Sequence, residues 1–177
     1  MTNNNNKNNN IEVNVLSLPE VTALIREKFA DVVEPLPEQG EQNSASHAEC
    51  KVMPLSLIPL CRELKAAGYG FLADITAVDY LEQGIFRLLY QICNFKNADS
   101  LTLKVEIPRE EPVVDSLCSV WPAANWPERE VYDMFGIVFK GHPQMERILM
   151  WEGFEGWPLR RDYVHQPSKY QGRRRLD

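Results

Sequence analysis

Long hydrophobic runs are missing from this 177-residue chain. No apolar stretch approaches the roughly 20 residues that a membrane-spanning helix requires, and the Asn-rich start lacks the apolar centre of a secretory signal. We therefore expect neither a membrane span nor export. Residues 1–10 carry too little apolar surface to order themselves, so they are predicted to form a disordered polar tail.

Cysteine and histidine are scarce, with four and three residues respectively. The cysteines (Cys50, Cys61, Cys93 and Cys118) lie far apart, form no CxxC pair and have no clustered histidine. This spacing predicts neither a zinc site nor an iron–sulfur cluster, and we expect buried free thiols in a reducing compartment. The chain also lacks a glycine-rich phosphate loop, a nucleophile elbow and an HExxH motif. No metal or cofactor is expected in this chain.

The net charge of −6 is unevenly distributed, because the residues from Lys140 onward carry +3 and the first 139 residues carry −9. Arg173, Arg174 and Arg175 make the C-terminal end basic. An acidic body repels nucleic acid, and three arginines are too few to define a binding surface. We expect no nucleic-acid partner.

The spacing of apolar residues predicts helices and strands connected by turns. Ser17 and Glu20 form a capping box before an amphipathic helix, and Gly68 ends a second helix capped by Ser56. β-Branched and aromatic residues mark the strands. The expected helices span 18–30, 57–67 and 113–120, the strands 49–53, 71–78, 85–95 and 100–107, and the main loop 34–46.

The last of these strands alternates most cleanly, with Leu101, Leu103, Val105 and Ile107 on one face. A strand with one wet side is typical of an antiparallel sheet. A meander of strands with helices packed against it gives an α+β fold. We expect a mainly antiparallel small sheet covered by helices on one face, over residues 11–140.

The run EREVYDMFGIVFKGHP, which begins at Glu128, is the most informative stretch of the chain. Asn125 and Glu128 have the spacing of a capping pair, and Pro127 suits the first turn of a helix. Gly136 suits the left-handed position that follows a last turn. The run predicts a short capped helix over 126–135 that leads into an extended segment.

The charged residues of this run, Glu128, Arg129, Glu130 and Asp133, allow two interpretations. Paired carboxylates beside an arginine occur in catalytic sites, which would suit a small stand-alone acid/base enzyme. On a helix, however, the two glutamates point in different directions and Arg129 lies one turn from Asp133. We favour a structural role with an Arg129–Asp133 ion pair and keep the enzyme as the alternative. His142, solitary in the sequence, is expected to be structural.

Periodicity fades after Lys140, while glycine, proline, tryptophan and arginine persist. Glycine and proline argue against a regular element there. Because Trp, Tyr and Arg dominate the centres of protein interfaces, residues 141–177 are predicted to form an extended C-terminal arm that docks on a partner. The alternative is a segment that wraps back over its own domain.

Five motifs in order resemble one family: ADITAVDY (73–80), VWPAANW (120–126), EREVYDMFGIVFKGHP (128–143), RIL (147–149) and GWPLRRDY (156–163). They make the chain similar to the 30 kDa subunit of the proton-pumping NADH:quinone oxidoreductase, respiratory complex I. One position departs from the family pattern. Four residues after the histidine of GHP the family usually has a basic residue or proline, and here Glu146 stands there.

The resemblance implies a non-catalytic subunit of the peripheral arm of the complex, with a structural and assembly role. It implies that FMN, iron–sulfur clusters and quinone are bound by other subunits, and that this chain packs chiefly against the quinone-site subunit and the subunit with the terminal cluster. It also implies a hetero-oligomer that associates with the membrane only through the complex. The expected side is the cytoplasmic face of a bacterial inner membrane, or the matrix side in mitochondria.

A homologous subunit of a membrane-bound hydrogenase, or of a dehydrogenase complex with another electron donor, stays open as an alternative. In either complex, the residues of the family motifs are expected at the interface with partner subunits. The residues concerned are Glu128, Arg129, Glu130, Asp133, Met134, Phe135, Gly136, His142, Pro143, Arg147, Trp157, Pro158, Leu159, Arg160, Arg161, Asp162 and Tyr163.

Overall fold

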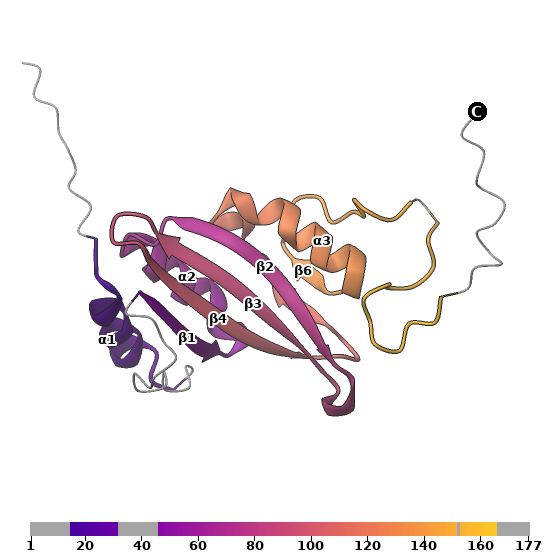
Figure 1. Ribbon diagram of the computed structural model, residues 1–177, viewed down its shortest axis with the longest axis horizontal. Helices are drawn as coiled ribbons and strands as arrows, with labels where there is room; N and C mark the ends of the chain where they lie inside the picture. The colour runs from indigo at the N-terminus through magenta and orange to yellow at the C-terminus, as the bar shows by residue number, and fades with distance from the viewer. Residues whose placement is uncertain (1–14, 32–45, 152, 166–177) are drawn as a thin grey trace, which may run out of the picture.

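The computed structural model describes residues 15–31, 46–151 and 153–165. The predicted tail of residues 1–10 and nearly all of the predicted loop of residues 34–46 lie outside these ranges. Figure 1 shows a sheet in the middle, α1 (Leu18–Lys28) at one end and the residues after β6 (Val138–Lys140) at the other.

The central feature is a four-stranded sheet with the order β1-β4-β3-β2. Both pairings among β2, β3 and β4 are antiparallel, and β1 joins β4 in parallel. The predicted α+β class and mainly antiparallel sheet are confirmed. The strand bounds are His47–Val52 for β1, Phe71–Tyr80 for β2, Ile85–Asn94 for β3 and Asp99–Pro108 for β4.

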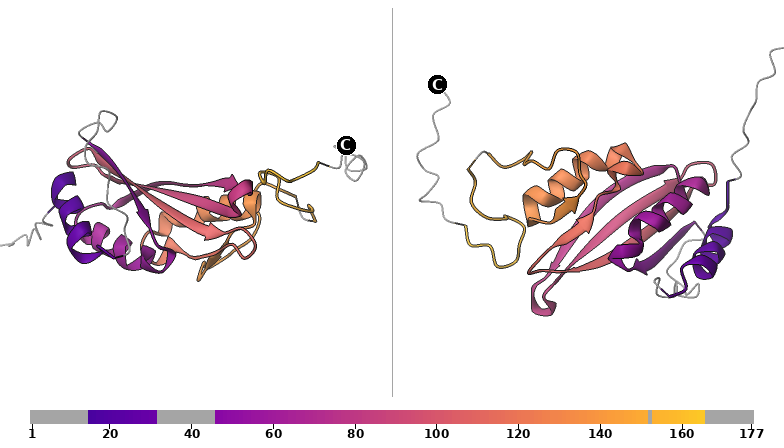
Figure 2. Two further views of the ribbon diagram at one scale, coloured as in Figure 1. Left: turned by 90° about the horizontal axis from the view of Figure 1, so that it is seen from below. Right: turned by 180° about the vertical axis from the view of Figure 1, so that it is seen from behind.

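The helices α1 (Leu18–Lys28) and α2 (Leu57–Ala66) contribute to one core with the inner face of the sheet. Viewed from behind, α2 and α3 (Asn125–Phe135) cover this face (Figure 2). The alternation predicted for the last strand is confirmed, since its inward residues Leu101, Leu103 and Val105 are fully buried. Hydrophobic burial of the strand residues on this face therefore fixes which side of the sheet the helices occupy.

The helix ends follow the sequence in part. The Glu20 carboxylate accepts hydrogen bonds from the Ser17 N–H and hydroxyl, both at 2.7 Å, so the first capping box is confirmed. Gly68 ends the second helical region with φ of 99°, as expected. Ser56 makes no capping bond, because a 3₁₀ turn (Pro54–Ser56) precedes α2 and shapes its start instead.

A second, two-stranded sheet was not expected from the sequence. Strand β5 (Val113–Asp115) pairs in parallel with β6 (Val138–Lys140). The helix predicted over residues 113–120 is therefore wrong. β-Branched Val113 and Val114 pair with β6, and only a 3₁₀ turn (Leu117–Ser119) follows them.

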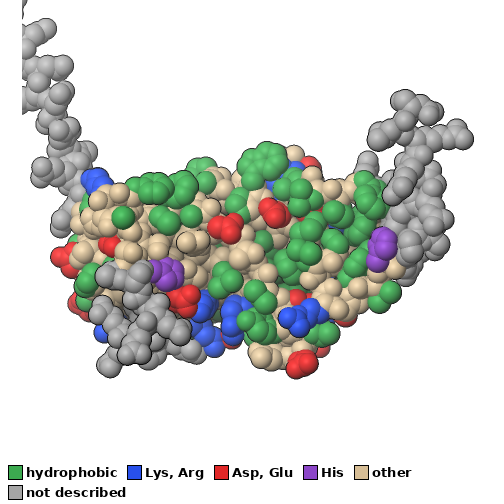
Figure 3. All heavy atoms as spheres, in the orientation of Figure 1, with side chains coloured by type: hydrophobic (Ala, Val, Ile, Leu, Met, Phe, Trp, Pro, Cys, Tyr) green, Lys and Arg blue, Asp and Glu red, His purple; other side chains and the backbone are tan. Residues whose placement is uncertain are grey.

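The outer face of the main sheet is polar over β1 and β4. Glu106 binds both Lys51 and Arg87, at 3.0 and 2.6 Å, and Lys104 pairs with Glu49. Figure 3 shows this face, with Lys and Arg side chains gathered along its lower part. These half-buried pairs lie on the solvent side of the sheet, where ion pairs contribute little to stability.

The thiols are only partly as expected. Cys50 and Cys61 are buried in the core, whereas Cys93 and Cys118 are half-buried. Cys93 lies on the outer face of β3, paired with Ser100, because strand residues alternate between the two faces.

Candidate partner-docking site

Helix α3 (Asn125–Phe135) carries the central motif and matches the predicted helix to within a residue. Its cap differs: Ala124 occupies the N-cap position with no side-chain bond, and Asn125 lies inside the helix. The predicted Asn125–Glu128 capping pair is therefore wrong. Gly136 follows the helix in the left-handed conformation, with φ of 73°, as expected.

Glu128 points into the protein instead of toward the helix end. Its side chain is buried, Oε1 accepts a hydrogen bond from the Leu117 N–H at 2.7 Å, and Oε2 accepts one from the Ser116 hydroxyl at 2.6 Å. Burial raises the pKa of Glu128 to about 7, although these hydrogen bonds act in the opposite direction. Glu128 thus connects α3 to the start of the 3₁₀ turn Leu117–Ser119.

Three metal-ligand types meet beside this carboxylate. Single donor atoms of Cys118, Glu128 and His142 all lie within 4.8 Å of one another, although the sequence spacing predicted no such group. The imidazole is already committed, since Nδ1 accepts from the Gln144 N–H at 3.0 Å and Nε2 bonds the Asn125 carbonyl at 3.1 Å. Glu128 likewise has its own donors. The group is satisfied as a hydrogen-bonded cluster that fixes the GHP turn to α3.

Asp133, in the last turn of α3, is the main anchor for the segment after β6. Its Oδ2 accepts hydrogen bonds from three successive N–H groups, of Ile148, Leu149 and Met150, at 3.0, 2.7 and 2.9 Å. Its Oδ1 lies 3.0 Å from Nη1 of Arg147. Burial acts to raise the pKa of Asp133, but these donors outweigh it and hold the pKa below its usual range.

The predicted Arg129–Asp133 ion pair is wrong. Arg129 Nε donates to the carbonyl of Glu146 at 3.1 Å, and its guanidinium lies 5.2 Å from the centre of the Trp126 ring. Asp133 is buried under the returning chain, where Arg147 reaches it. The sequence could not favour this partner, since Arg147 lies outside the helix and 14 positions away from Asp133.

The tryptophan of the GWP motif packs on the end of α3. A Cβ added at Gly136 would lie 2.4 Å from the Trp157 ring, so only glycine leaves room for the indole. The ring also makes an edge contact with Tyr132, at 5.3 Å between centroids, and the Arg147 guanidinium stacks on it at 4.3 Å. Arg147 Nη2 donates to the Gly156 carbonyl at 2.9 Å.

A second carboxylate, Asp79 near the end of β2, holds the other end of the segment. It pairs with Arg109 at 2.9 Å and accepts the Arg161 N–H at 2.9 Å. Arg109 also binds Asp162. The sequence motifs did not single out Asp79 as an anchor, although its alternation with Ile75 and Ala77 already placed it on the inward face of the strand.

The structure divides the predicted interface residues into two groups. Glu128, Asp133, Met134, Phe135 and Gly136 are buried within the chain, so they can only support a docking surface. The other group reaches solvent in whole or in part: Arg129, Glu130, His142, Pro143, Arg147, Trp157, Pro158, Leu159, Arg160, Arg161, Asp162 and Tyr163. Contact of this second group with a partner stays a prediction.

The segment after β6 wraps back over its own domain through the contacts of Arg147, Trp157 and Arg161, as the less favoured interpretation had it. It has no regular element in its described part and extends beyond α3 (Figure 1). Glu130 is exposed while Glu128 and Asp133 are buried with separate partners. The three carboxylates therefore share no space in which a stand-alone acid/base enzyme could hold a substrate.

No helix in the described part of the chain is long and apolar enough to cross a membrane. The family model described as the respiratory-chain NADH dehydrogenase 30 Kd subunit matches residues 50–169. The C subunit of NADH-quinone oxidoreductase from Geotalea uraniireducens is 40% identical over 155 residues, which cover 84% of this chain and 91% of the relative. The C subunit from Geobacter metallireducens is 38% identical, and the match covers 84% of this chain and 93% of that relative.

Two solved structures share the fold. A chain of the membrane-bound sulfane sulfur reductase, an archaeal respiratory membrane complex, matches with a TM-score of 0.73 and 26% identity over 90% of this chain and 92% of that one. A trypsin-resistant fragment of Nqo5 matches with a TM-score of 0.59 and 29% identity, over 73% of this chain and 99% of the fragment. By its motifs, its fold and these matches, the chain belongs to the 30 kDa subunit family of the respiratory-chain NADH dehydrogenase.

Proposed function

We propose that this chain is the non-catalytic 30 kDa subunit of an NADH:quinone oxidoreductase, with a structural and assembly role in the peripheral arm. The observation that carries the proposal is the segment after β6, which two buried carboxylates, Asp133 and Asp79, hold in an irregular but fixed path. A fixed irregular segment rich in Trp and Arg presents side chains to a partner at low entropic cost. The relatives from Geotalea and Geobacter support the assignment.

In this proposal the partners are the quinone-site subunit and the subunit with the terminal iron–sulfur cluster. FMN, iron–sulfur clusters and quinone belong to partner subunits, and electrons pass from NADH to quinone in those subunits with proton translocation. The chain reaches the membrane only through the complex, on the cytoplasmic side of a bacterial inner membrane or the matrix side in mitochondria.

A homologous subunit of another membrane-bound redox complex is the second candidate. The fold match to the sulfane sulfur reductase favours it, because the same fold serves a complex with a different reductase activity. Identity of 40% to the Geotalea quinone reductase chain, against 26% to the sulfur reductase chain, favours the quinone reductase.

Native electrophoresis of gently solubilised membranes, followed by an antibody to this chain, tests the proposal. We expect the chain to migrate in one band with flavin and iron–sulfur subunits, and that band to oxidise NADH with quinone as acceptor. A band that reduces another acceptor but not quinone would favour the second candidate. Quinone reduction by the purified chain alone would contradict a non-catalytic role, and Glu130→Ala would then abolish turnover.

A further inference from the structure

Arg160, in the GWPLRRDY motif, is a guanidinium with part of its hydrogen-bonding capacity unused. Its Nε donates to the Phe135 carbonyl at 2.6 Å, and its Cζ lies 5.2 Å from the centre of the Phe86 ring and 5.9 Å from that of Trp157. One hydrogen bond and two rings therefore fix the group in place. No residue in the ranges 15–31, 46–151 and 153–165 accepts a hydrogen bond from Nη1 or Nη2, the two terminal amino groups of Arg160.

The nearby carboxylates are already taken by another arginine. Arg109 binds Asp79 through Nε and Nη2 and binds Asp162 as well. Burial and the charge of Arg109 lower the pKa of Arg160. Within the part of the chain that the structure describes, no carboxylate forms an ion pair with this half-buried cation, an unfavourable arrangement that an incoming anion would relieve.

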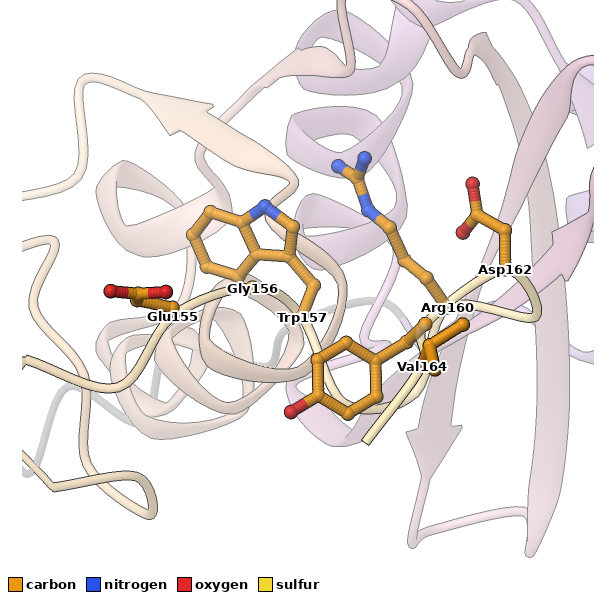
Figure 4. A pocket seen from close by; sticks show the side chains of 7 residues that line it. Glu155, Gly156, Trp157, Arg160, Asp162 and Val164 are labelled. Carbon is orange, nitrogen blue, oxygen red and sulfur yellow. The ribbon is translucent and has the colours of Figure 1, made fainter. Parts of the chain in front are cut away.

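Arg160 also helps to line a pocket large enough for one side chain. Trp157, Arg160, Asp162 and Tyr163 contribute to its lining, and its volume is about 400 Å³. Figure 4 shows Arg160 extending between the side chains of Trp157 and Asp162. A ring-lined entrance with a fixed guanidinium suits a short apolar stem that ends in a planar anion.

We propose that the Arg160 pocket receives a glutamate or aspartate side chain of a partner subunit, whose carboxylate pairs with the two terminal amino groups of Arg160. The inference rests on the proposed function, because it names the chemistry of the partner that docks on the segment after β6. A protein carboxylate fits better than a phosphate group, since Glu155 and Asp162 also line the pocket and would repel the larger negative charge.

The next residue in the chain provides a matched control. Arg161 carries the same charge, but its side chain is exposed, and its hydrogen bond to the described residues comes from the backbone N–H, which donates to Asp79. Replacing either arginine with glutamine removes one charge from the same segment. Only Arg160→Gln removes the fixed guanidinium beside Trp157, so the pair separates a specific contact from a general charge effect.

The test measures binding of the purified chain to the partner subunits isolated from a strain that lacks it. We expect Arg160→Gln to weaken binding by about 30-fold or more, the loss typical of a desolvated charge pair, and Arg161→Gln by only a few-fold. Arg160→Lys should be intermediate, because an ammonium cannot pair bidentately with a carboxylate. Thermal melts check that each variant folds, and Arg160→Lys carries the test if Arg160→Gln does not fold.

Equal weakening by Arg160→Gln and Arg161→Gln would overturn the inference, because only net charge would then matter. Protection of Arg160 from phenylglyoxal by inorganic phosphate, in the isolated chain, would also overturn it and assign the pocket to a small anion. If the wild-type chain did not bind the partner subunits at all, the proposed function itself would fail. Binding that is insensitive to Arg160 would remove only this inference.

Discussion

The sheet and the segment after β6 are held in place by different physical forces. The sheet packs side chains such as Leu88, Tyr90 and Leu103 into a core with no exposure to solvent. In the described residues from 141 to 165, only Phe154 is buried. The apolar core holds the sheet together, whereas Asp133, Asp79 and the Trp157 ring hold this segment against the domain.

This difference predicts different cooperativity. Apolar burial contributes about 25 cal/mol per Å² over the whole sheet, so its strands unfold together. The segment depends on a few charge-assisted hydrogen bonds at isolated points, and such regions open locally at lower free energy than the core. The domain can therefore stay folded while the segment after β6 opens locally.

Leu103→Ala should have the largest effect and should act on the whole domain. The side chain is fully buried at the centre of β4, so its removal leaves a cavity that costs about 2–5 kcal/mol of unfolding free energy. Urea denaturation measures the loss. Lys104→Ala, the next residue on the outer face, should cost about 1 kcal/mol or less, because it removes only a surface ion pair. Similar losses for both variants would contradict an apolar origin of domain stability.

Glu128 should make domain stability depend on pH near neutrality. Its pKa is about 7 in the fold against 4.5 ordinarily, so the folded state binds the proton more tightly than the unfolded chain. Its contribution is full at low pH and is lost as the pH rises from about 4.5 to 7, by at most about 3 kcal/mol. Urea denaturation across this range should show the decline, and Glu128→Gln should flatten it. An unchanged slope in the variant would mean that another group titrates.

The sequence predicted the sheet well because the pattern of each strand is local. Alternation in the last strand identifies its buried face and agrees with its antiparallel pairing to β3, but not with the parallel pairing to β1 on its other edge. The parallel pairing of β5 with β6 joins residues 25 positions apart at Val113 and Val138, and no local pattern records it. A three-residue strand also carries too little periodicity to distinguish from a helix.

The anchors of the arm were harder to predict for a related reason. A carboxylate on a helix can pair with several different groups, and the sequence favoured the nearest arginine on the helix, Arg129, as the partner of Asp133. The fold instead brings Arg147 and three backbone N–H groups to Asp133. Gly136 was placed correctly for its backbone, but the requirement of Trp157 for space appears only in three dimensions.

Asp133→Ala should release the arm with less effect on the sheet. The N–H groups of residues 148–150 lose their acceptor but can return to water once the segment detaches, so we expect a loss of about 1.5–3 kcal/mol, within the range for hydrogen bonds to a charged group. Hydrogen exchange should show these amides unprotected while β4 stays protected. Glu130→Ala, an exposed carboxylate of the same helix, is the control and should change neither region.

The pH dependence of this anchor should be opposite in sign to that of Glu128. Because the pKa of Asp133 is held low, its contribution is present above the unfolded pKa of about 3.9 and is lost as the pH falls through the folded value. Acid should therefore expose the arm amides while the domain still has protonated Glu128. Loss of protection in β4 before residues 148–150 would contradict the separation of the two regions.

The excess loss of Gly136→Ala over Gly84→Ala should be the smallest effect and should isolate the Trp157 contact. An alanine with φ near 73° is strained by about 1–2 kcal/mol, and its Cβ would also displace the indole. Gly84→Ala is a matched control, since Gly84 has φ of 66° and a Cβ there would meet nothing within 4 Å. The backbone strain cancels between the two variants, and any additional loss in Gly136→Ala measures what the Trp157 contact contributes. Equal thermal shifts, with the Leu159 amide still protected through its bond to Met134, would show that the arm does not depend on this ring.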